Sequence, residues 1–138
     1  MNFLFASSHS LALPIAKSLS GIAGFSGFLT KPDAPSGRDR TLRENSFSSA
    51  VIELERPVFK AETESEITKL LTGLEIELVI TCAYGKFISE ELLKIPKYGW
   101  LNIHYSSLPK WRGAAPVQRA IMAGESEICY LIFKMDKG

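Results

Sequence analysis

Short apolar blocks alternate with mixed apolar and polar blocks along this 138-residue chain. Compact apolar runs rich in β-branched and aromatic side chains favour buried strands, and they fall at 2–6, 22–29, 57–59, 77–83, 99–105 and 128–135. Apolar positions at helical spacing predict helices at 11–19, 64–71, 89–95 and 116–123. Strands that alternate with helices predict an α/β fold, a Rossmann-like and mostly parallel sheet with helices on both faces.

Proline and glycine interrupt the pattern in one long segment, residues 30–46, which contains Pro32, Pro35 and Gly37. We expect a loop there, and a loop of this length in a compact domain is usually functional or disordered. In the helix predicted at 64–71, Gly73 is the expected cap.

The stretch GWLNIHYSSLP, residues 99–109, begins as a strand and ends as a polar turn. Asn102 and His104 lie near the carboxyl end of that strand, where open parallel sheets bind their ligands. The two-residue period places both side chains on one face, about 6–7 Å apart along the strand. Two interpretations stay open from position alone: a polar pair that bonds a neighbouring loop, or an active site.

Composition narrows the class of protein. A hydrophobic content of 46% with 22% charged residues is typical of a soluble globular domain, and a net charge of +1 leaves nucleic-acid contact to a local basic patch. Cys82 and Cys129 lie in apolar runs, so both are expected to be buried, reduced thiols. With His9 and His104 they form no metal-ligand spacing. The N-terminus resembles neither a signal peptide nor a membrane span, which predicts a cytoplasmic protein without a membrane partner.

The residue pair suggests a particular chemistry. The chain has no nucleophile elbow and no glycine-rich phosphate loop. A neutral histidine beside an amide donor suits oxyanion stabilisation and proton management, while the substrate supplies its own nucleophile. The sequence pattern identifies no carboxylate that would orient His104.

A longer set of motifs contains this pair. NIH at 102–104, SSLP at 106–109 and KWRGAAPVQ at 110–118 resemble the signature of the 10-formyltetrahydrofolate-dependent formyltransferases. The resemblance also includes TKPDAPSGR at 30–38, AYG at 83–85 and MDKG at 135–138. Within that family, the string WRGAAPVQRAI is most similar to the members that formylate methionyl initiator tRNA.

The resemblance implies transfer of a formyl group from 10-formyltetrahydrofolate, a co-substrate, to the amino group of methionyl initiator tRNA, with no metal and no covalent enzyme intermediate. It implies that Asn102 donates to the developing oxyanion, and that His104 stabilises this charge and assists proton transfer. The implied folate contacts are Ser106, Ser107, Leu108, Pro109, Ala83, Tyr84 and Gly85.

The segment 31–43 has four basic and two acidic residues, hence a net charge of +2. Taken alone it reads as a solvated surface loop. The resemblance implies instead that Arg38, Arg40 and Arg43 reach the acceptor stem of the tRNA, since arginine pairs with phosphates and stacks on exposed bases. Trp111 and Arg112 also have two interpretations, a buried anchor under the turn or a wall for the aminoacyl end.

Three positions depart from the family pattern. Tyr105 stands where a small residue is usual, and its bulk could shift the backbone that aims His104. Ser107 replaces a leucine, and the turn at 7–9, SSH, replaces a glycine-containing turn.

The resemblance also implies a domain organisation. Residues 1–138 correspond to the formyltransferase catalytic domain, incomplete at its C-terminal end, without the family's catalytic aspartate and C-terminal β-barrel domain. We therefore expect these residues alone to be inactive or weakly active, and to self-associate through an unpaired strand edge at 128–135, whereas the longer enzyme is expected to be a monomer.

Three alternatives remain open at this stage. One is a formyltransferase that acts on an amino-sugar nucleotide or on a purine precursor. Another is a non-catalytic remnant that binds folate or RNA. A plain nucleotide-binding Rossmann domain is the weakest, because no glycine-rich fingerprint follows the first strand.

Overall fold

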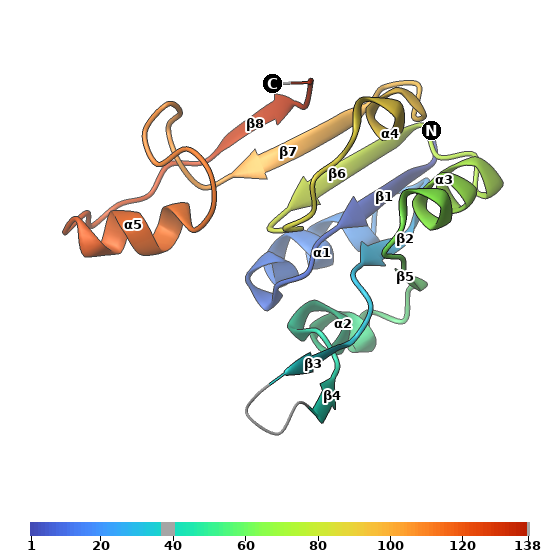
Figure 1. The fold of residues 1–138 in the computed structure, drawn as a ribbon, viewed down its shortest axis with the longest axis horizontal. Helices are drawn as coiled ribbons and strands as arrows, with labels where there is room; N and C mark the ends of the chain where they lie inside the picture. The colour runs from blue at the N-terminus through green and yellow to red at the C-terminus, as the bar shows by residue number, and fades with distance from the viewer. Residues whose placement is uncertain (37–40, 138) are drawn as a thin grey trace.

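A six-stranded sheet forms the centre of the computed structural model, which describes residues 1–36 and 41–137 (Figure 1). The strands are β1 (Phe3–Ala6), β2 (Phe25–Thr30), β5 (Val58–Lys60), β6 (Leu78–Cys82), β7 (Trp100–His104) and β8 (Leu131–Lys134). Their order is β5-β2-β1-β6-β7-β8, and every neighbouring pair is parallel except β7–β8. The predicted Rossmann-like, mostly parallel sheet is confirmed.

Helices cover this sheet on both faces, as predicted. They are the 3-10 turns η1 (Ser10–Ala12) and η2 (Ile52–Leu54) and the helices α1 (Leu13–Ser20), α2 (Ser46–Val51), α3 (Glu64–Gly73), α4 (Glu90–Lys94) and α5 (Pro116–Met122). Leu4 of β1 packs in one core with α3 and α4, whereas Phe5 packs in a second core with α1 and α2. Successive side chains of a strand point to opposite faces, so the two cores lie on opposite sides of the sheet.

The prediction of a loop at residues 30–46 was partly wrong. Its described residues form an antiparallel pair, β3 (Ala34–Ser36) and β4 (Thr41–Arg43), which we call the arm. The helix α2 that follows was not predicted, because its sequence SFSSAV is rich in weak helix formers. The Asn45 side chain caps it by accepting from the Ser48 N–H at 2.9 Å. Two residues of the helix itself, Phe47 and Val51, are fully buried. Tertiary burial therefore overrides local propensity here.

The ends of several strands and helices also differ from the predicted ones. The strand predicted at 22–29 begins at Phe25, because Ile22 lies in a turn and is half exposed. The strand predicted at 128–135 is only β8, Leu131–Lys134. Gly73 is the last residue of α3, and Leu74 is its cap, so the predicted glycine cap was wrong.

The two cysteines have different environments. Cys82 is buried in the core beneath α1 and α2, and burial raises the pKa of its thiol. Cys129 is exposed, so the prediction of two buried thiols was wrong for this residue. Cys129 precedes β8, an edge strand whose own side chains are mostly exposed, so this part of the described chain provides little cover.

The C-terminal part of the chain is less covered than the rest. Helix α5 lies beyond the carboxyl end of β7, apart from the other helices (Figure 1). Met122 is 87% exposed and Ile132 is 53% exposed. Strand β8 forms one edge of the sheet, while association through that edge stays a prediction. In the described residues, none of the helices combines the length and the apolar character that a membrane crossing requires.

Trp100 provides a test of the core. It is fully buried, and its indole Nε1 donates to the Leu92 carbonyl oxygen at 2.8 Å. Trp100→Phe leaves that carbonyl without its donor, so the free energy of unfolding should fall by about 1–3 kcal/mol. Urea denaturation measures the loss. Tyr130→Phe, at a side chain that is 68% exposed, serves as the control and should stay within about 0.5 kcal/mol of the wild type.

Thiol labelling tests the placement of the two cysteines. Cys129 should react rapidly with an aromatic disulfide reagent in the folded protein, whereas Cys82 should react only after unfolding, because reactivity requires an accessible thiolate. Cys129→Ser should abolish the rapid phase. Two rapidly reacting thiols in the folded wild type would show that this part of the core is open.

Candidate active site

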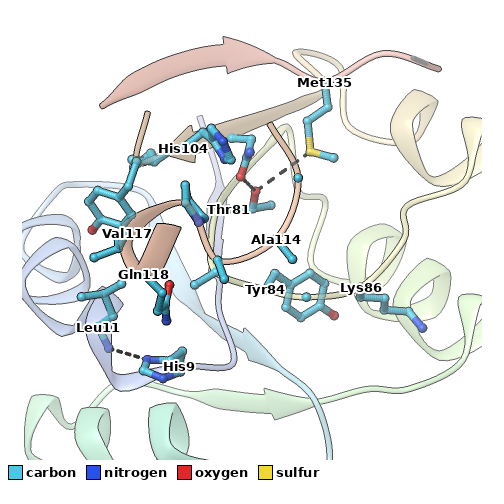
Figure 2. Close-up of a pocket in the computed structure, with 18 of the residues that line it drawn as sticks. His9, Leu11, Thr81, Tyr84, Lys86, His104, Ala114, Val117, Gln118 and Met135 are labelled. Atoms are coloured by element: carbon cyan, nitrogen blue, oxygen red, sulfur yellow. Dashed lines mark hydrogen bonds between the residues drawn. The ribbon is translucent and has the colours of Figure 1, made fainter. Parts of the chain in front are cut away.

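A cavity of about 510 Å³ opens at the carboxyl ends of the parallel strands (Figure 2). Its walls come from the turn after β1, the loop after β6, the end of β7 and the segment 113–118 that leads into α5. This volume lies within the range of small-molecule sites, about 300–1,000 Å³. Figure 2 shows His104 and His9 at opposite ends of the lining.

Asn102 and His104 both line the cavity, as their shared strand face predicts. Strand pairing places Thr81 of β6 directly opposite Asn102 of β7. The buried Thr81 hydroxyl donates to Asn102 Oδ1 at 2.7 Å. Because this bond occupies the amide oxygen, the Asn102 Nδ2 group is left to donate to a ligand.

A backbone carbonyl orients the imidazole of His104. The ring Nε2 lies 3.3 Å from the Trp111 carbonyl oxygen. A carbonyl oxygen only accepts hydrogen bonds, so this contact favours the tautomer protonated at Nε2 and leaves Nδ1 as the basic nitrogen. In the described residues, the group that faces this ring nitrogen is thus a main-chain carbonyl, and whether a carboxylate also orients the ring stays a prediction.

Trp111 is anchored away from the main cavity. Its indole Nε1 donates to Glu125 Oε1 at 3.1 Å, and Lys110 forms an ion pair with the same carboxylate. The Lys110 partner holds the pKa of Glu125 below its usual range. Trp111 itself has φ = 56°, a left-handed conformation that turns the chain and aims its carbonyl at His104. Glu125 therefore anchors the Trp111 ring, although the side chain is half-buried rather than buried.

A second cavity, of about 620 Å³, adjoins the first. Asn102, His104, Gly113 and Met135 line both cavities. Asn102 and His104 therefore lie at the junction of the two cavities. Their side chains can contact a ligand group that enters from either cavity. Arg112 lines the second cavity, so it is a wall residue rather than a buried anchor.

The residues implied in folate binding surround the pair but do not share one cavity. Ala83, Tyr84 and Gly85 line the 510 Å³ cavity, and Leu108 and Pro109 line the 620 Å³ cavity. Ser106 and Ser107 line a third one, of about 420 Å³, on the side of Trp111. The Ser106 and Tyr84 hydroxyls are buried, and neither has a hydrogen-bond partner in the described part of the chain. Burial raises the pKa of the Tyr84 phenol above its usual range.

The structure accommodates Tyr105 without displacing His104 from the cavity. Tyr105, which follows the last residue of β7, and Ile103 pack against the core of Phe5 and Phe28, and both also line the 510 Å³ cavity. Burial is the main cause that raises the pKa of the Tyr105 phenol to about 12, and the neighbouring Cys82 adds to it. The core and the rim of the cavity therefore share the extra bulk.

The turn after β1, SSH at 7–9, which departs from the family pattern, contributes residues that were not among the predicted site residues. His9 lines the cavity, and its Nδ1 accepts from the Leu11 N–H at 3.1 Å. The Ser8 hydroxyl donates to the Tyr84 carbonyl at 2.9 Å. Thr81 was also missed, although a polar residue inside the apolar run ELVITCA is a signal that could have identified it.

The remaining predicted site residues belong to the arm. Arg43, at the end of β4, is exposed. Arg38 and Arg40 lie outside the described residues. Within residues 1–36 and 41–137, no group of three or more histidine, cysteine, aspartate or glutamate side chains could hold a metal ion.

Comparison with known proteins gives consistent matches. The profile described as "Formyl transferase" matches residues 8–138. The methionyl-tRNA formyltransferase of Cutibacterium acnes is 40% identical over 139 residues, which cover 98% of this chain and 44% of the relative. The corresponding protein of Renibacterium salmoninarum is 39% identical over 141 residues, with 100% and 46% covered. The chain thus spans less than half the length of these curated relatives.

Solved structures share the fold at low sequence identity. Phosphoribosylglycinamide formyltransferase from Bacillus halodurans superposes with a TM-score of 0.73 at 19% identity, over 100% of this chain and 73% of the other. Glycinamide ribonucleotide transformylase 1 from Geobacillus kaustophilus has a TM-score of 0.68 at 22% identity, with 100% and 76% covered. These matches show that the architecture is common to formyltransferases with different sequences.

Thr81→Val tests the hydrogen bond that orients Asn102. The substitution keeps the shape of the side chain but removes the hydroxyl, so Asn102 Oδ1 loses its donor. The free energy of unfolding should fall by about 1–3 kcal/mol in urea denaturation. Thr81→Ser keeps the hydroxyl and should lose less. Equal losses in both variants would show that the methyl group, not the hydrogen bond, matters here.

Proposed function

Because this chain belongs to the formyl transferase family, we propose that its protein transfers a formyl group from 10-formyltetrahydrofolate to the amino group of methionyl initiator tRNA. The observation that carries the proposal is the Asn102–His104 pair at the junction of two cavities, since two substrates must meet at one point. The relatives named methionyl-tRNA formyltransferase support the choice of acceptor. We place this protein in the cytoplasm, where translation begins.

The proposed chemistry needs no covalent enzyme intermediate. The substrate amine attacks the formyl carbon, a new carbon–nitrogen bond forms, and the bond from that carbon to N10 of the folate breaks. The Thr81 hydroxyl holds Asn102 Oδ1, which leaves the donor end of the amide to face a ligand and supports a role in binding the oxyanion that develops on the formyl oxygen. His104 accepts the proton of the attacking amine at Nδ1 and returns it to the departing N10.

The α-amino group suits this reaction near neutral pH. Its pKa near 8 leaves a useful fraction of the amine neutral and nucleophilic. Orientation of that amine against the formyl group can then supply much of the rate. The enzyme has to position the amine and stabilise charge rather than create a nucleophile, which fits a site whose polar centre is an amide and an imidazole.

We place the folate along the walls that meet at the pair. Ala83, Tyr84 and Gly85 border one cavity, and Leu108 and Pro109 border the other. A folate whose formyl group reaches Asn102 can contact both sets of residues. We include Ser106 and Ser107 as further contacts of the turn, supported by the resemblance and by the unpaired Ser106 hydroxyl.

The arm is our proposed contact for the acceptor stem of the tRNA. Arg43 lies on its second strand, and Arg38 and Arg40 belong to the same segment of sequence. The arm follows β2, whose carboxyl end lies at the same edge of the sheet as the cavity (Figure 1). An RNA held there has its acceptor end on the side where the Asn102–His104 pair lies.

Two substitutions separate chemistry from tRNA binding in the protein that carries this chain. His104→Ala should lower the formylation rate by about 10²–10⁴-fold and leave the Kd for tRNA unchanged. Arg43→Ala should raise that Kd and reduce its salt dependence by about one ion, with a smaller effect on the saturated rate. Single-turnover formylation and filter binding at several salt concentrations provide the two readouts.

The control for the second substitution is Arg56→Ala. It removes the same charge at an exposed residue before the amino end of β5, away from the arm. Its tRNA affinity should match that of the wild type. Equal effects of His104→Ala and Arg43→Ala on rate and binding would refute this division of roles. Preference for an amino-sugar nucleotide or a purine precursor in a side-by-side acceptor assay would refute the proposed substrate.

A further inference from the structure

Hydrogen bonds from two other segments hold the cavity wall at Ala83–Gly85. The Ala83 carbonyl accepts from the Ser8 N–H at 3.2 Å, and the Tyr84 carbonyl accepts from the Ser8 hydroxyl at 2.9 Å. The Gly85 carbonyl accepts from the Nζ of Lys31. Ser8 follows β1 and Lys31 follows β2, so the wall is fastened from two neighbouring strand ends.

The wall depends on such support because of its backbone conformation. Ala83 has φ = 50° and Gly85 has φ = 64°, both in the left-handed region. A residue other than glycine adopts that region where surrounding contacts hold it there. Loss of an external hydrogen bond should therefore allow the wall to change shape, and with it the cavity that Ala83, Tyr84 and Gly85 line.

Lys31 is itself held in place by its main chain. Asn45 Nδ2 donates to the Lys31 carbonyl oxygen at 2.6 Å. The Oδ1 of the same amide accepts from the Thr30 hydroxyl at 3.1 Å and from the Ser48 N–H at 2.9 Å. The backbone of Lys31 is thus tied both to the end of β2 and to the start of α2.

The base of the arm lies next to Lys31 in sequence. Lys60 Nζ contacts Asp33 Oδ1 at 2.8 Å and Glu44 Oε1 at 3.4 Å, and so joins the two ends of the arm. These carboxylates, Asp33 foremost, raise the pKa of Lys60. Ion pairs with Lys60 thus hold the two ends of the arm together. Lys31, two residues before Asp33, links this end of the arm to the cavity wall through its hydrogen bond to the Gly85 carbonyl oxygen.

We propose that Lys31 is a positioning residue that couples the arm to the cavity: through Gly85 it sets the shape of the wall, and RNA on the arm and folate in the cavity strengthen each other's binding. The identity of the two ligands rests on the proposed function. Coupling of this kind is reciprocal, so each ligand must change the affinity of the other by the same factor. Lys86 does not duplicate the role, since its Nζ donates to the Glu62 carbonyl oxygen.

The test compares Lys31→Met, which keeps the length of the side chain and removes the donor, with Lys31→Arg, which retains a cation. In the protein that carries this chain, calorimetry gives the Kd of 10-formyltetrahydrofolate with and without uncharged initiator tRNA, which prevents turnover. The wild type should bind folate more tightly with tRNA present. Lys31→Met should lose this coupling and bind folate about tenfold more weakly. Lys31→Arg should retain most of both properties.

Lys17→Met is the matched control, because it removes the same charge from an exposed position on α1. It should keep the coupling of the wild type. A Lys31→Met protein that retains wild-type coupling and folate affinity would overturn the proposal, as would a control that loses them to the same extent.

Amide hydrogen exchange separates this inference from the proposed function. Without any ligand, Lys31→Met should speed exchange in residues 84–88, and Lys31→Arg should not. A wild type that binds neither folate nor tRNA refutes the proposed function, but faster exchange in Lys31→Met still supports the positioning role. Unchanged exchange in that variant refutes the positioning role whatever the ligands are.

Discussion

The register between β6 and β7 is the constraint on which the site depends. It places Thr81 opposite Asn102 in the lining of the cavity, and Cys82 opposite Ile103, which packs against the core and also reaches the cavity. A shift of one residue would exchange the two faces of the strand and bury the polar pair among phenylalanine side chains. The buried Trp100, bonded to the Leu92 carbonyl at the start of β7, secures the same register from its other end.

Main-chain carbonyl groups do much of the positioning around this strand. The Trp111 carbonyl faces the imidazole of His104, and the carbonyls of Ala83, Tyr84 and Gly85 anchor the opposite wall. Carbonyl groups do not titrate, so the acceptor in each of these contacts keeps its charge state when pH changes. The charge of His104 can then change during a reaction without loss of the groups that hold the cavity in shape.

The architecture and the choice of substrate are separate questions in this family. Enzymes whose sequences differ strongly from this chain share the sheet and its helices. The carboxyl edge of the sheet carries the junction of cavities, and the loops at such an edge are where binding residues are usually found. In this chain we propose that the arm and the segment 113–118 bear on the acceptor, and neither is a member of the central sheet.

The sequence by itself determined the six strands of the central sheet, the helices α1, α3, α4 and α5, and the shared face of Asn102 and His104, because hydrophobic periodicity and strand alternation are local properties. Only the tertiary structure decided the orienting partners, since Thr81 and Trp111 meet the pair through strand pairing and a left-handed turn. The same limit explains the exposed Cys129, the unpredicted helix α2 and the division of the turn 106–109 between two cavities. Burial and contact depend on segments far away in sequence, and no local pattern contains them.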